Sequence, residues 1–379
     1  MIYKLASNTA FKILAISGDD IRNMGGGEKA LLNMCQLFEI QIISIQRTQD
    51  LYVNAELNQN CSIKFIYTIV FPKLKFAIPL GLFLGLKCRE VRKYSHIISF
   101  HSNVFSLLYI IMMNKITRKP IVLFLHDPTF FRRNTATSKF YWRIQMFLIR
   151  MIPDIHVEMN EQARFLRNKR YFGRICTFPL FFPKKIEKSL IRTNDVFTVL
   201  FVGRLDSFQK GVDLLETIIR KSVQKDNSIL FHIVGQDYGG MGSVEKVKKK
   251  FPANVRYLGR ISEAELEMEY MNSSVFVSTS RYETLGLSIL EAVNHGLAVI
   301  YFNVISLDGV IDMDFGEAVP SFNTDIFSAA IYRLYEKWKA DPEQFLGDRI
   351  SRIKKFEEYF SEISMKQRVI DLLELSRTK

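Results

Sequence analysis

The stretch FTVLFVGRLDSFQKGVDLL at 197–215 decides the fold. A continuous apolar run ends at Gly203, a polar loop with the cations Arg204 and Lys210 follows, and Val212 and Leu215 then recur with helical spacing. An apolar run of this length is typical of a strand buried on both faces of a parallel sheet. The stretch therefore predicts a strand, a ligand-sized loop and a helix, the repeating unit of a doubly wound α/β sheet.

The same alternation runs along both halves of the chain. Further apolar runs that predict buried strands are KILAIS at 12–17, QIISIQ at 41–46, KFIYT at 64–68, HIISF at 96–100, IVLFLH at 121–126, ILFHIVG at 229–235, VFVSTS at 275–280 and AVIYF at 298–302. A stretch rich in Pro and Lys around 179–195 interrupts the rhythm and predicts a linker. We expect an α/β protein with two doubly wound domains at 1–187 and 188–359, followed by terminal helices.

Composition excludes several classes of protein. The chain has 379 residues, 48% of them hydrophobic, which suffices for full cores and excludes disorder and fibrous repeats. Its 4 cysteines show no paired spacing, so we expect a reducing compartment and no zinc site. The apolar stretches 76–86 and 104–113 are too short to span a bilayer, and no leader pattern is seen at the start. A cytoplasmic protein is therefore expected.

Charge is divided unevenly along the chain. Residues 1–190 hold 28 Lys and Arg against 12 Asp and Glu, or +16, and the remainder of the total of +13 gives −3 for 191–379. The basic half suits an anionic membrane face, a phosphate-bearing lipid, an acidic polymer or nucleic acid. No nucleic-acid-binding motif accompanies the charge, so nucleic acid is not an expected partner. The cations around 76–86 leave two interpretations open, a surface lying in a membrane interface and a buried helix with solvated ends.

The most specific motif is SRYETLGLSILEA at 280–292, directly after a predicted strand. It places Glu283 in a loop, a turn at Gly286, and Glu291 on the helix that follows. Were the segment all helical, about 12 Å would separate the two carboxylates, too far for a glycosidase pair. The spacing suits two carboxylates that bind hydroxyl groups at the ends of an extended ligand, with helix N-terminal amides at 285–287 for an anion between them. A capped helix with two solvated glutamates is the alternative.

Two cations follow the strand at 197–202 in a second motif. Arg204 can grip oxygens bidentately, Lys210 adds a point charge, and Gly203 lets a ligand approach the backbone closely. Together they match the charge of a diphosphate. Surface cations on an ordinary strand-loop-helix unit are the alternative interpretation.

These two motifs, with HIVG at 232–235 and VRYLGRISEAEL at 255–266 between them, resemble the donor domain of glycosyltransferase family 4, whose members are retaining enzymes of the GT-B fold. The N-terminal half is similar more loosely, through GGGE at 25–28 and LHD at 125–127. The resemblance implies two Rossmann-like domains facing across a cleft, with the nucleotide on the C-terminal domain and the acceptor on the N-terminal one. It also implies that a helix at about 360–379 packs back on the first domain.

The resemblance implies roles for individual residues. Glu291 would bind the ribose hydroxyls, Glu283 the transferred sugar, and Arg204 and Lys210 the diphosphate, whose growing charge they would stabilise. Arg204, Lys210, Glu283 and His126, which borders the transferred sugar, form the expected catalytic set. The remaining expected contacts are to the donor from Gly203, Arg260, Ile261, Leu285, Gly286 and Leu287, and to phosphate and acceptor from a loop formed by Gly25, Gly26 and Gly27.

The sequence thus predicts a retaining glycosyltransferase that moves a hexose from a nucleotide sugar, expected to be UDP-linked, to a lipid-linked, polysaccharide or glycoconjugate acceptor in cell-surface polysaccharide synthesis. We expect no cofactor and no metal, although Asp312-Met313-Asp314 has a metal-binding spacing. A place at the inner face of the plasma membrane is compatible with the basic half. An inactive GT-B homologue that supports a partner glycosyltransferase, and a nucleotide-sugar epimerase or hydrolase on the same fold, remain alternatives.

Overall fold

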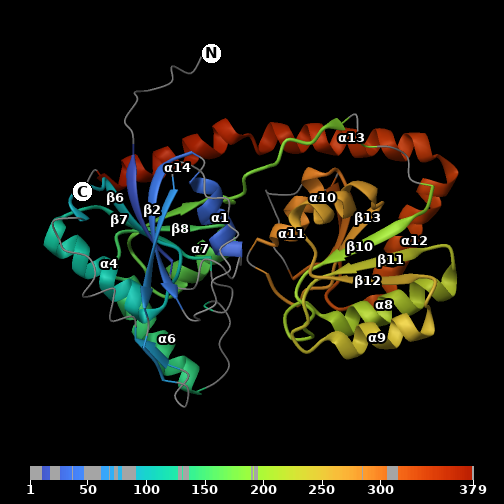
Figure 1. The fold of residues 1–379 in the computed structure, drawn as a ribbon, viewed down its shortest axis with the longest axis horizontal. Coiled ribbons are helices and arrows are strands. Elements are labelled where there is room, and N and C mark those ends of the chain that lie inside the picture. The colour runs from blue at the N-terminus through green and yellow to red at the C-terminus, as the bar shows by residue number, and fades with distance from the viewer. Residues whose placement is uncertain are drawn as a thin grey trace. The chain divides into compact units, whose positions relative to one another are not determined.

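The chain forms two compact units in the computed structural model (Figure 1). Unit 1 comprises Met1–Phe182 and Ile363–Lys379, and unit 2 comprises Pro183–Glu362. The expected boundary at 187/188 falls a few residues after the observed one. The structure describes residues 11–17, 26–35, 37–46, 61–67, 69–71, 76–78, 91–126, 130, 136–188, 191, 195–283, 285–304 and 315–377.

Unit 1 is built on a seven-stranded parallel sheet with the order β3-β2-β1-β6-β7-β8-β9. Its strands are β1 Lys12–Ser17, β2 Glu39–Gln46, β3 Cys61–Tyr67, β6 His96–Ser99, β7 Ile121–Phe124, β8 Asp154–Val157 and β9 Arg174–Thr177. Its helices are α1 Gly26–Met34, α4 Val104–Thr117, α6 Ala136–Ile149, α7 Asn160–Asn168 and α14 Glu362–Arg377. A separate antiparallel hairpin joins β4 Ile69–Phe71 to β5 Phe76–Ile78.

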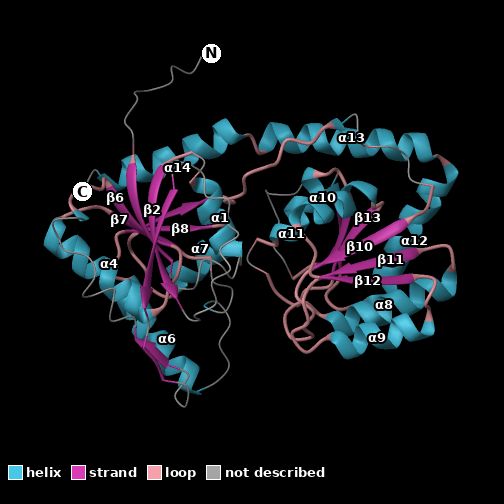
Figure 2. Ribbon diagram, viewed as in Figure 1, coloured by secondary structure: helices cyan, strands magenta, loops and turns pink. Residues whose placement is uncertain are grey.

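Unit 2 repeats the design with a six-stranded parallel sheet of order β12-β11-β10-β13-β14-β15. Its strands are β10 Thr198–Val202, β11 Leu230–Val234, β12 Val255–Gly259, β13 Val275–Ser278, β14 Ala298–Phe302 and β15 Gly316–Val319. Its helices are α8 Val212–Lys225, α9 Met241–Lys250, α10 Glu263–Asn272, α11 Leu287–Asn294, α12 Thr324–Ala340 and α13 Pro342–Tyr359. Figure 2 shows helices on both sides of the strands in this unit.

The central strands of the two parallel sheets are buried on both faces, which explains the continuous apolar runs. In β1, Ile13 and Ala15 join the core that includes residues of α1 and α14, whereas Leu14 and Ile16 join the core beneath α4 and α6. Side chains alternate along a strand, so a strand covered on both faces needs apolar residues at every position. Every apolar run expected to be a strand contains one, within a few residues at its ends.

The helix at the end of the described chain belongs to unit 1. Val369, Leu372 and Leu373 of α14 lie in the same core cluster as Phe11 and Leu180. His96 of β6 also hydrogen-bonds the carbonyl of Leu373 through Nε2, at 2.9 Å. Segments far apart in the sequence therefore share one core in this unit. Among the described residues, no helix is both long and apolar enough to cross a bilayer.

Strand order determines where loops can meet. In unit 2 the chain moves outward from β10 to β11 and β12, then returns to place β13 on the other side of β10. The loops that leave the carboxyl ends of β10 and β13 therefore start side by side. In sheets of this kind ligands bind at such a switch point. Both motifs that the sequence singles out lie in these two loops.

Candidate active site

The loop after β10 is held by the side chain of Asp206. Its Oδ1 accepts hydrogen bonds from the backbone N–H groups of Gln209 at 2.5 Å and Lys210 at 3.3 Å. Gly211 then opens α8 with a φ of +66°, a conformation that favours glycine. A Cβ at this position would lie 2.2 Å from the carbonyl oxygen of Thr279, so Gly211 also permits the close approach of the β13 loop.

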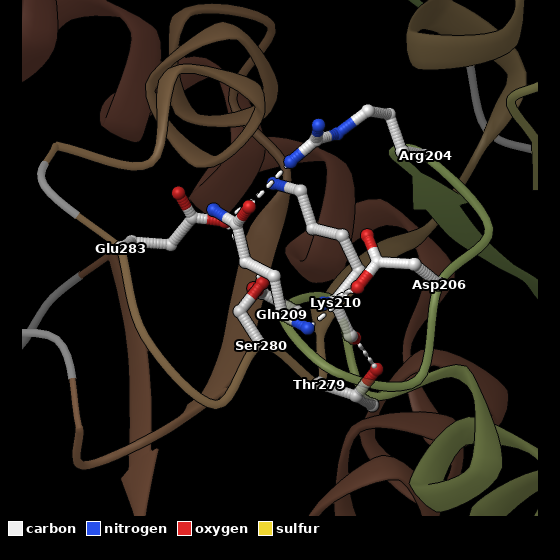
Figure 3. Close-up of polar contacts among 8 residues, drawn as sticks. Arg204, Asp206, Gln209, Lys210, Thr279, Ser280 and Glu283 are labelled. Carbon is white, nitrogen blue, oxygen red and sulfur yellow. Dashed lines mark hydrogen bonds and ion pairs between the residues drawn. The ribbon is translucent and has the colours of Figure 1, made fainter. Parts of the chain in front are cut away.

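Lys210 and Glu283 form an ion pair between the two loops (Figure 3). Glu283 Oε1 also accepts a hydrogen bond from Ser280 Oγ at 2.9 Å, and Thr279 Oγ1 donates to the backbone carbonyl of Lys210 at 2.8 Å. The two side chains are 16% and 9% exposed. The pair thus sets a cation and an anion at the carboxyl edge of the sheet, both partly shielded from water.

Arg204 lies beside this pair. Its guanidinium donates from Nη2 to Gln209 Oε1, and the same group lies over the ring of Tyr238 at 5.5 Å from the ring centroid. Figure 3 shows the Arg204 and Lys210 side chains converging from the same loop. Arg204 is otherwise exposed. The sequence expected two cations near Glu283, and the structure brings Lys210 to it and places Arg204 next to Gln209.

A second ion pair fastens the β13 loop to α8. Arg281 donates from Nη1 and Nη2 to the two carboxylate oxygens of Asp213, at 2.8 and 2.6 Å, and from its backbone N–H to the Gln209 carbonyl at 2.7 Å. The hydrogen bonds from Arg281 lower the pKa of Asp213, and the same interaction raises the pKa of Arg281. This bidentate pair fixes the loops that carry Lys210 and Glu283.

Glu291 lies on α11 and has a buried tyrosine as partner. Tyr270 of α10 donates its hydroxyl to Glu291 Oε2 at 3.0 Å, and burial together with the charge of Glu291 raises the pKa of Tyr270 well above its usual value. The ring of His295 stacks on Tyr270 with centroids 5.0 Å apart. Only residues from Leu287 onward are helical here, so the all-helical spacing considered for Glu283 and Glu291 does not apply.

A buried arginine supports these two helices from α13. Arg349 is 4% exposed and donates to the carbonyls of Tyr270 at 2.8 Å, Ser273 at 3.0 Å and His295 at 3.0 Å. These carbonyls lie at the C-terminal ends of α10 and α11, where the helix dipole attracts a cation. Burial lowers the pKa of Arg349 to about 9. One side chain therefore ties together the elements that carry Tyr270 and Glu291.

The other expected donor contacts lie along the same sheet edge. Gly203 follows β10, Arg260 and Ile261 follow β12, and both of these parallel strands end at this edge. Arg260 is exposed and Ile261 half-buried. Leu285 is buried at 1% exposure, Gly286 caps α11 with a φ of +67°, and Leu287 is the first residue of that helix.

His126 lies in unit 1, just after β7, within a buried chain of polar groups. Its Nε2 is 3.1 Å from His156 Nδ1, its Nδ1 is 3.6 Å from Glu158 Oε1, and His156 Nε2 is 2.8 Å from the Phe178 carbonyl. That carbonyl can only accept, so His156 carries its proton on Nε2 when neutral and Nδ1 accepts from His126. Burial, followed by the charge of His156, lowers the pKa of His126 well below its usual value.

The glycine run adopts a different local structure from the expected loop. Gly26 and Gly27 form the first turn of α1, and Gly25 lies outside the described residues. Asp312-Met313-Asp314 and most of 76–86 also lie outside them; Phe76–Ile78 is the strand β5.

Sequence reasoning missed the residues that support the site. The residues that contact an expected site residue or its helix are Asp206, Gln209, Ser280, Tyr270 and Arg349, and Asp213 holds the β13 loop through Arg281. The one local signal for Asp206 is its place in a polar loop, five positions before Gly211 at the start of α8. Tyr270 and Arg349 had no such local signal, because each reaches its partner only through the packing of α10 and α13 against α11.

Comparison with known proteins agrees with this architecture. Residues 196–337, which include both loops of the site, match the family model of the glycosyl transferases group 1. The amylovoran biosynthesis glycosyltransferase AmsD of Erwinia amylovora is 34% identical over 175 residues, which is 45% of this chain and 47% of that protein. The phosphatidyl-myo-inositol mannosyltransferase of Mycobacterium tuberculosis is 28% identical over 136 residues, 35% of each chain. The chain thus aligns with less than half the length of either relative.

Solved structures extend the likeness to the whole fold. HepE of Anabaena, solved in complex with UDP, superposes with a TM-score of 0.71 at 15% identity, covering 96% of this chain and 100% of that one. Identity at this level speaks for the fold alone. The two Rossmann-like sheets and the likeness to HepE together give the chain the GT-B fold, and its residues 196–337 match the model of the glycosyl transferases group 1.

Proposed function

We propose that the protein is a retaining glycosyltransferase that moves a hexose from a UDP-linked sugar to a lipid-linked or polysaccharide acceptor in surface polysaccharide synthesis. The observation that carries the proposal is the pairing of Lys210 with Glu283, beside Arg204, at the β10–β13 switch point. The site combines cations for a diphosphate with carboxylates for hydroxyl groups. The named function of AmsD and the UDP bound to HepE support the acceptor class and the nucleotide.

Each residue has a defined task in this proposal. Arg204 and Lys210 bind the diphosphate and stabilise the negative charge that grows on it as the glycosidic bond breaks. Glu291, oriented by Tyr270, accepts hydrogen bonds from the ribose hydroxyls. Glu283 binds hydroxyl groups of the sugar, and in the absence of substrate it is the partner of Lys210.

Retention follows from transfer on one face of the sugar. A donor phosphate oxygen accepts the proton of the acceptor hydroxyl as that hydroxyl attacks the anomeric carbon, and the diphosphate leaves from the same side. The step uses no carboxylate nucleophile and no metal ion. A covalent glycosyl-enzyme trapped on Glu283 would contradict this mechanism.

The acceptor side of the proposal rests on unit 1. Its net charge is strongly positive in sequence, which favours an acidic glycan or a phosphate-bearing lipid. His126 would border the transferred sugar, and its neutral imidazole suits hydrogen bonding to a hydroxyl group rather than to an anion. We place the reaction at the cytoplasmic face of the membrane. Cell fractionation tests this location by showing whether the protein is recovered with the membrane fraction.

Nucleotide binding offers the first test. A thermal-shift panel of UDP, GDP, ADP and their sugars should show stabilisation of about 2.7 kcal/mol for the preferred nucleotide at 100 times its dissociation constant. Glu291→Ala should abolish that shift because the ribose loses its carboxylate. Glu283→Gln is the matched control, since it should retain the shift with UDP and lose the additional affinity for the UDP-sugar.

The outcomes separate the alternatives. Unchanged UDP affinity in Glu291→Ala would refute the ribose assignment. Nucleotide binding with no sugar transfer to any lipid or glycan fraction would indicate an inactive homologue. Release of the free sugar with no acceptor would indicate a hydrolase.

A further inference from the structure

Helix α6 of unit 1 presents large apolar side chains to solvent. Phe140 is 67% exposed, Phe147 63% and Met151, just past the helix, 42%, with Ile144 and Tyr141 at 36%. Residues 140, 144, 147 and 151 recur at intervals of four and three, so they form one stripe along the helix. The opposite face, with Met146 and Ile149, lies in the core. The helix is therefore apolar on both sides, unlike an ordinary surface helix.

Cations accompany the stripe. Lys139, Arg143 and Arg150 are exposed, and their positions on the helix place them along one flank of the stripe. From 139 to 151 every exposed residue is either one of these cations or one of the apolar residues named above. The described residues between 104 and 153, which include the neighbouring α4, hold no Asp or Glu. The surface thus combines apolar area with charge of a single sign.

We propose that the exposed face of α6 docks on the surface of an anionic lipid bilayer. A helix with an apolar stripe and flanking cations lies in the plane of the interface, with the stripe among the acyl chains and the cations at the headgroups. At 14 residues α6 is too short to span the bilayer. In Figure 1 it lies at the margin of unit 1, next to α4.

A second copy of the chain fits this surface poorly. A two-fold interface brings the same patch of each copy together. Here it would set Lys139, Arg143 and Arg150 against the same cations, with no carboxylate on the described parts of α4 or α6 to pair with them. Charge complementarity therefore favours an anionic surface, and phosphatidylglycerol is a suitable probe. The proposal does not depend on glycosyl transfer, because docking is measured without substrate.

Liposome flotation tests the proposal with the full chain. Wild-type protein should float with phosphatidylcholine vesicles that contain phosphatidylglycerol, float less as salt rises, and stay in solution with phosphatidylcholine alone. Phe140→Ser/Phe147→Ser should lower partitioning by at least tenfold. Lys139→Glu/Arg143→Glu should lower it by about 25-fold, from roughly fivefold per cation near an anionic surface.

The matched control lies on α9, where Lys248 and Lys249 are exposed. None of the large apolar side chains of this helix is exposed. Lys248→Glu/Lys249→Glu should leave partitioning within twofold of wild type. Circular dichroism confirms folding, since all the altered side chains are exposed.

Three results of the flotation experiment would overturn the proposal. One is the absence of wild-type flotation at low salt, and another is flotation retained by both α6 variants. The third is an equal loss in the α9 control, which would mean unspecific attraction of basic protein. Self-association that Phe140→Ser/Phe147→Ser abolishes, without lipid binding, would assign the surface to a second copy instead.

Discussion

Lys210 and Glu283 come from loops 73 positions apart and are joined at the centre of the site. With no substrate bound, each neutralises the other, so neither is left as an unpaired charge in a partly buried place. A diphosphate would offer Lys210 a stronger partner and free Glu283 for the sugar. The ion pair is therefore compatible with a site that exchanges internal contacts for contacts to its ligand.

Removal of the Lys210 charge should act mainly on catalysis. Lys210→Met should lower kcat about 10²- to 10³-fold, as expected when one group that stabilises a developing anion is lost. Steady-state kinetics with the preferred UDP-sugar measures this change. Lys246→Met on α9 is the control, since Lys246 is 72% exposed and pairs with Glu216 away from the site. A fall in kcat of less than threefold for Lys210→Met would contradict the assignment.

Tyr270 should matter for the ribose and not for the diphosphate. Tyr270→Phe removes the hydroxyl that orients Glu291, so the dissociation constant for UDP should rise about tenfold, the cost of a lost hydrogen bond to a charged group. Affinity for inorganic pyrophosphate, which has no ribose, should stay unchanged. Calorimetric titration of both ligands checks this, and equal losses for both would point to a general distortion of unit 2.

At this scale the sequence predicted which side chains gather at the carboxyl edge of the sheet better than those that support them. Arg204, Lys210, Glu283 and Glu291 stand at strand ends and helix starts, where local pattern and chemistry coincide. Tyr270 and Arg349 look like ordinary residues of α10 and α13, and their roles arise only because the fold brings those helices to α11. The buried chain that joins His126 to His156 and Glu158 was likewise hidden, since His126 follows β7 whereas His156 lies in β8 and Glu158 just after it.

At the scale of elements, the junction between the β10 and β13 loops depends on a glycine. Gly211→Ala should destabilise unit 2 by about 1–3 kcal/mol, because alanine is strained at a positive φ and its Cβ would meet the Thr279 carbonyl. Gly242→Ala in α9 is the control: no atom lies within 4 Å of its Cβ, and it should stabilise the helix by about 0.5–1 kcal/mol. Urea unfolding followed by circular dichroism measures both. Equal effects of the two changes would contradict the contact with Thr279.

Sequence pattern predicted the strands well because burial on both faces leaves a continuous apolar run. It did not predict β8, β9, β12 or β15, because their sequences DIHV, RICT, VRYLG and GEAV mix polar or charged residues with apolar ones and so form no continuous apolar run. The glycine run at 25–27 was expected as a loop, but α1 begins at Gly26. Glycine destabilises the interior of a helix but is tolerated in its first turn. The sequence therefore does not determine where a helix begins within a run of glycines.

At the scale of the whole molecule, buried histidines should make the stability of unit 1 more sensitive to acid than that of unit 2. Burial lowers the pKa of His96 to about 4 and of His156 to about 3, and lowers that of His126, all in unit 1; in unit 2, burial lowers the pKa of His295. In the unfolded chain these imidazoles bind a proton near pH 6.5. The unfolded state therefore binds more protons below pH 6.5, and stability is lost as pH falls towards the folded pKa values.

Between pH 6.5 and 5, His96 and His156 of unit 1 should each remove about 2 kcal/mol of stability, at 1.36 kcal/mol per pH unit. As the pH falls, the backbone amides of unit 1 should consequently lose their protection from hydrogen exchange before those of unit 2. Hydrogen exchange at pH 7 and pH 5, corrected for the intrinsic rates, would show this as a larger loss in peptides from 91–126 than from 275–302. His96→Gln should reduce the pH dependence in unit 1. Equal losses in both units would contradict the prediction.

Helix α14 completes the core of unit 1 and follows all of unit 2 in the chain. The core of unit 1 therefore cannot be completed until unit 2 has been synthesised on the ribosome. Strand β1 emerges early, yet the apolar surface that Val369 and Leu373 cover stays open until the whole of unit 2 has been translated. Unit 2 is a continuous segment and can close its own core first. A nascent chain that stops before α14 would therefore expose this apolar surface, and we expect chaperones that bind exposed apolar residues to recognise it.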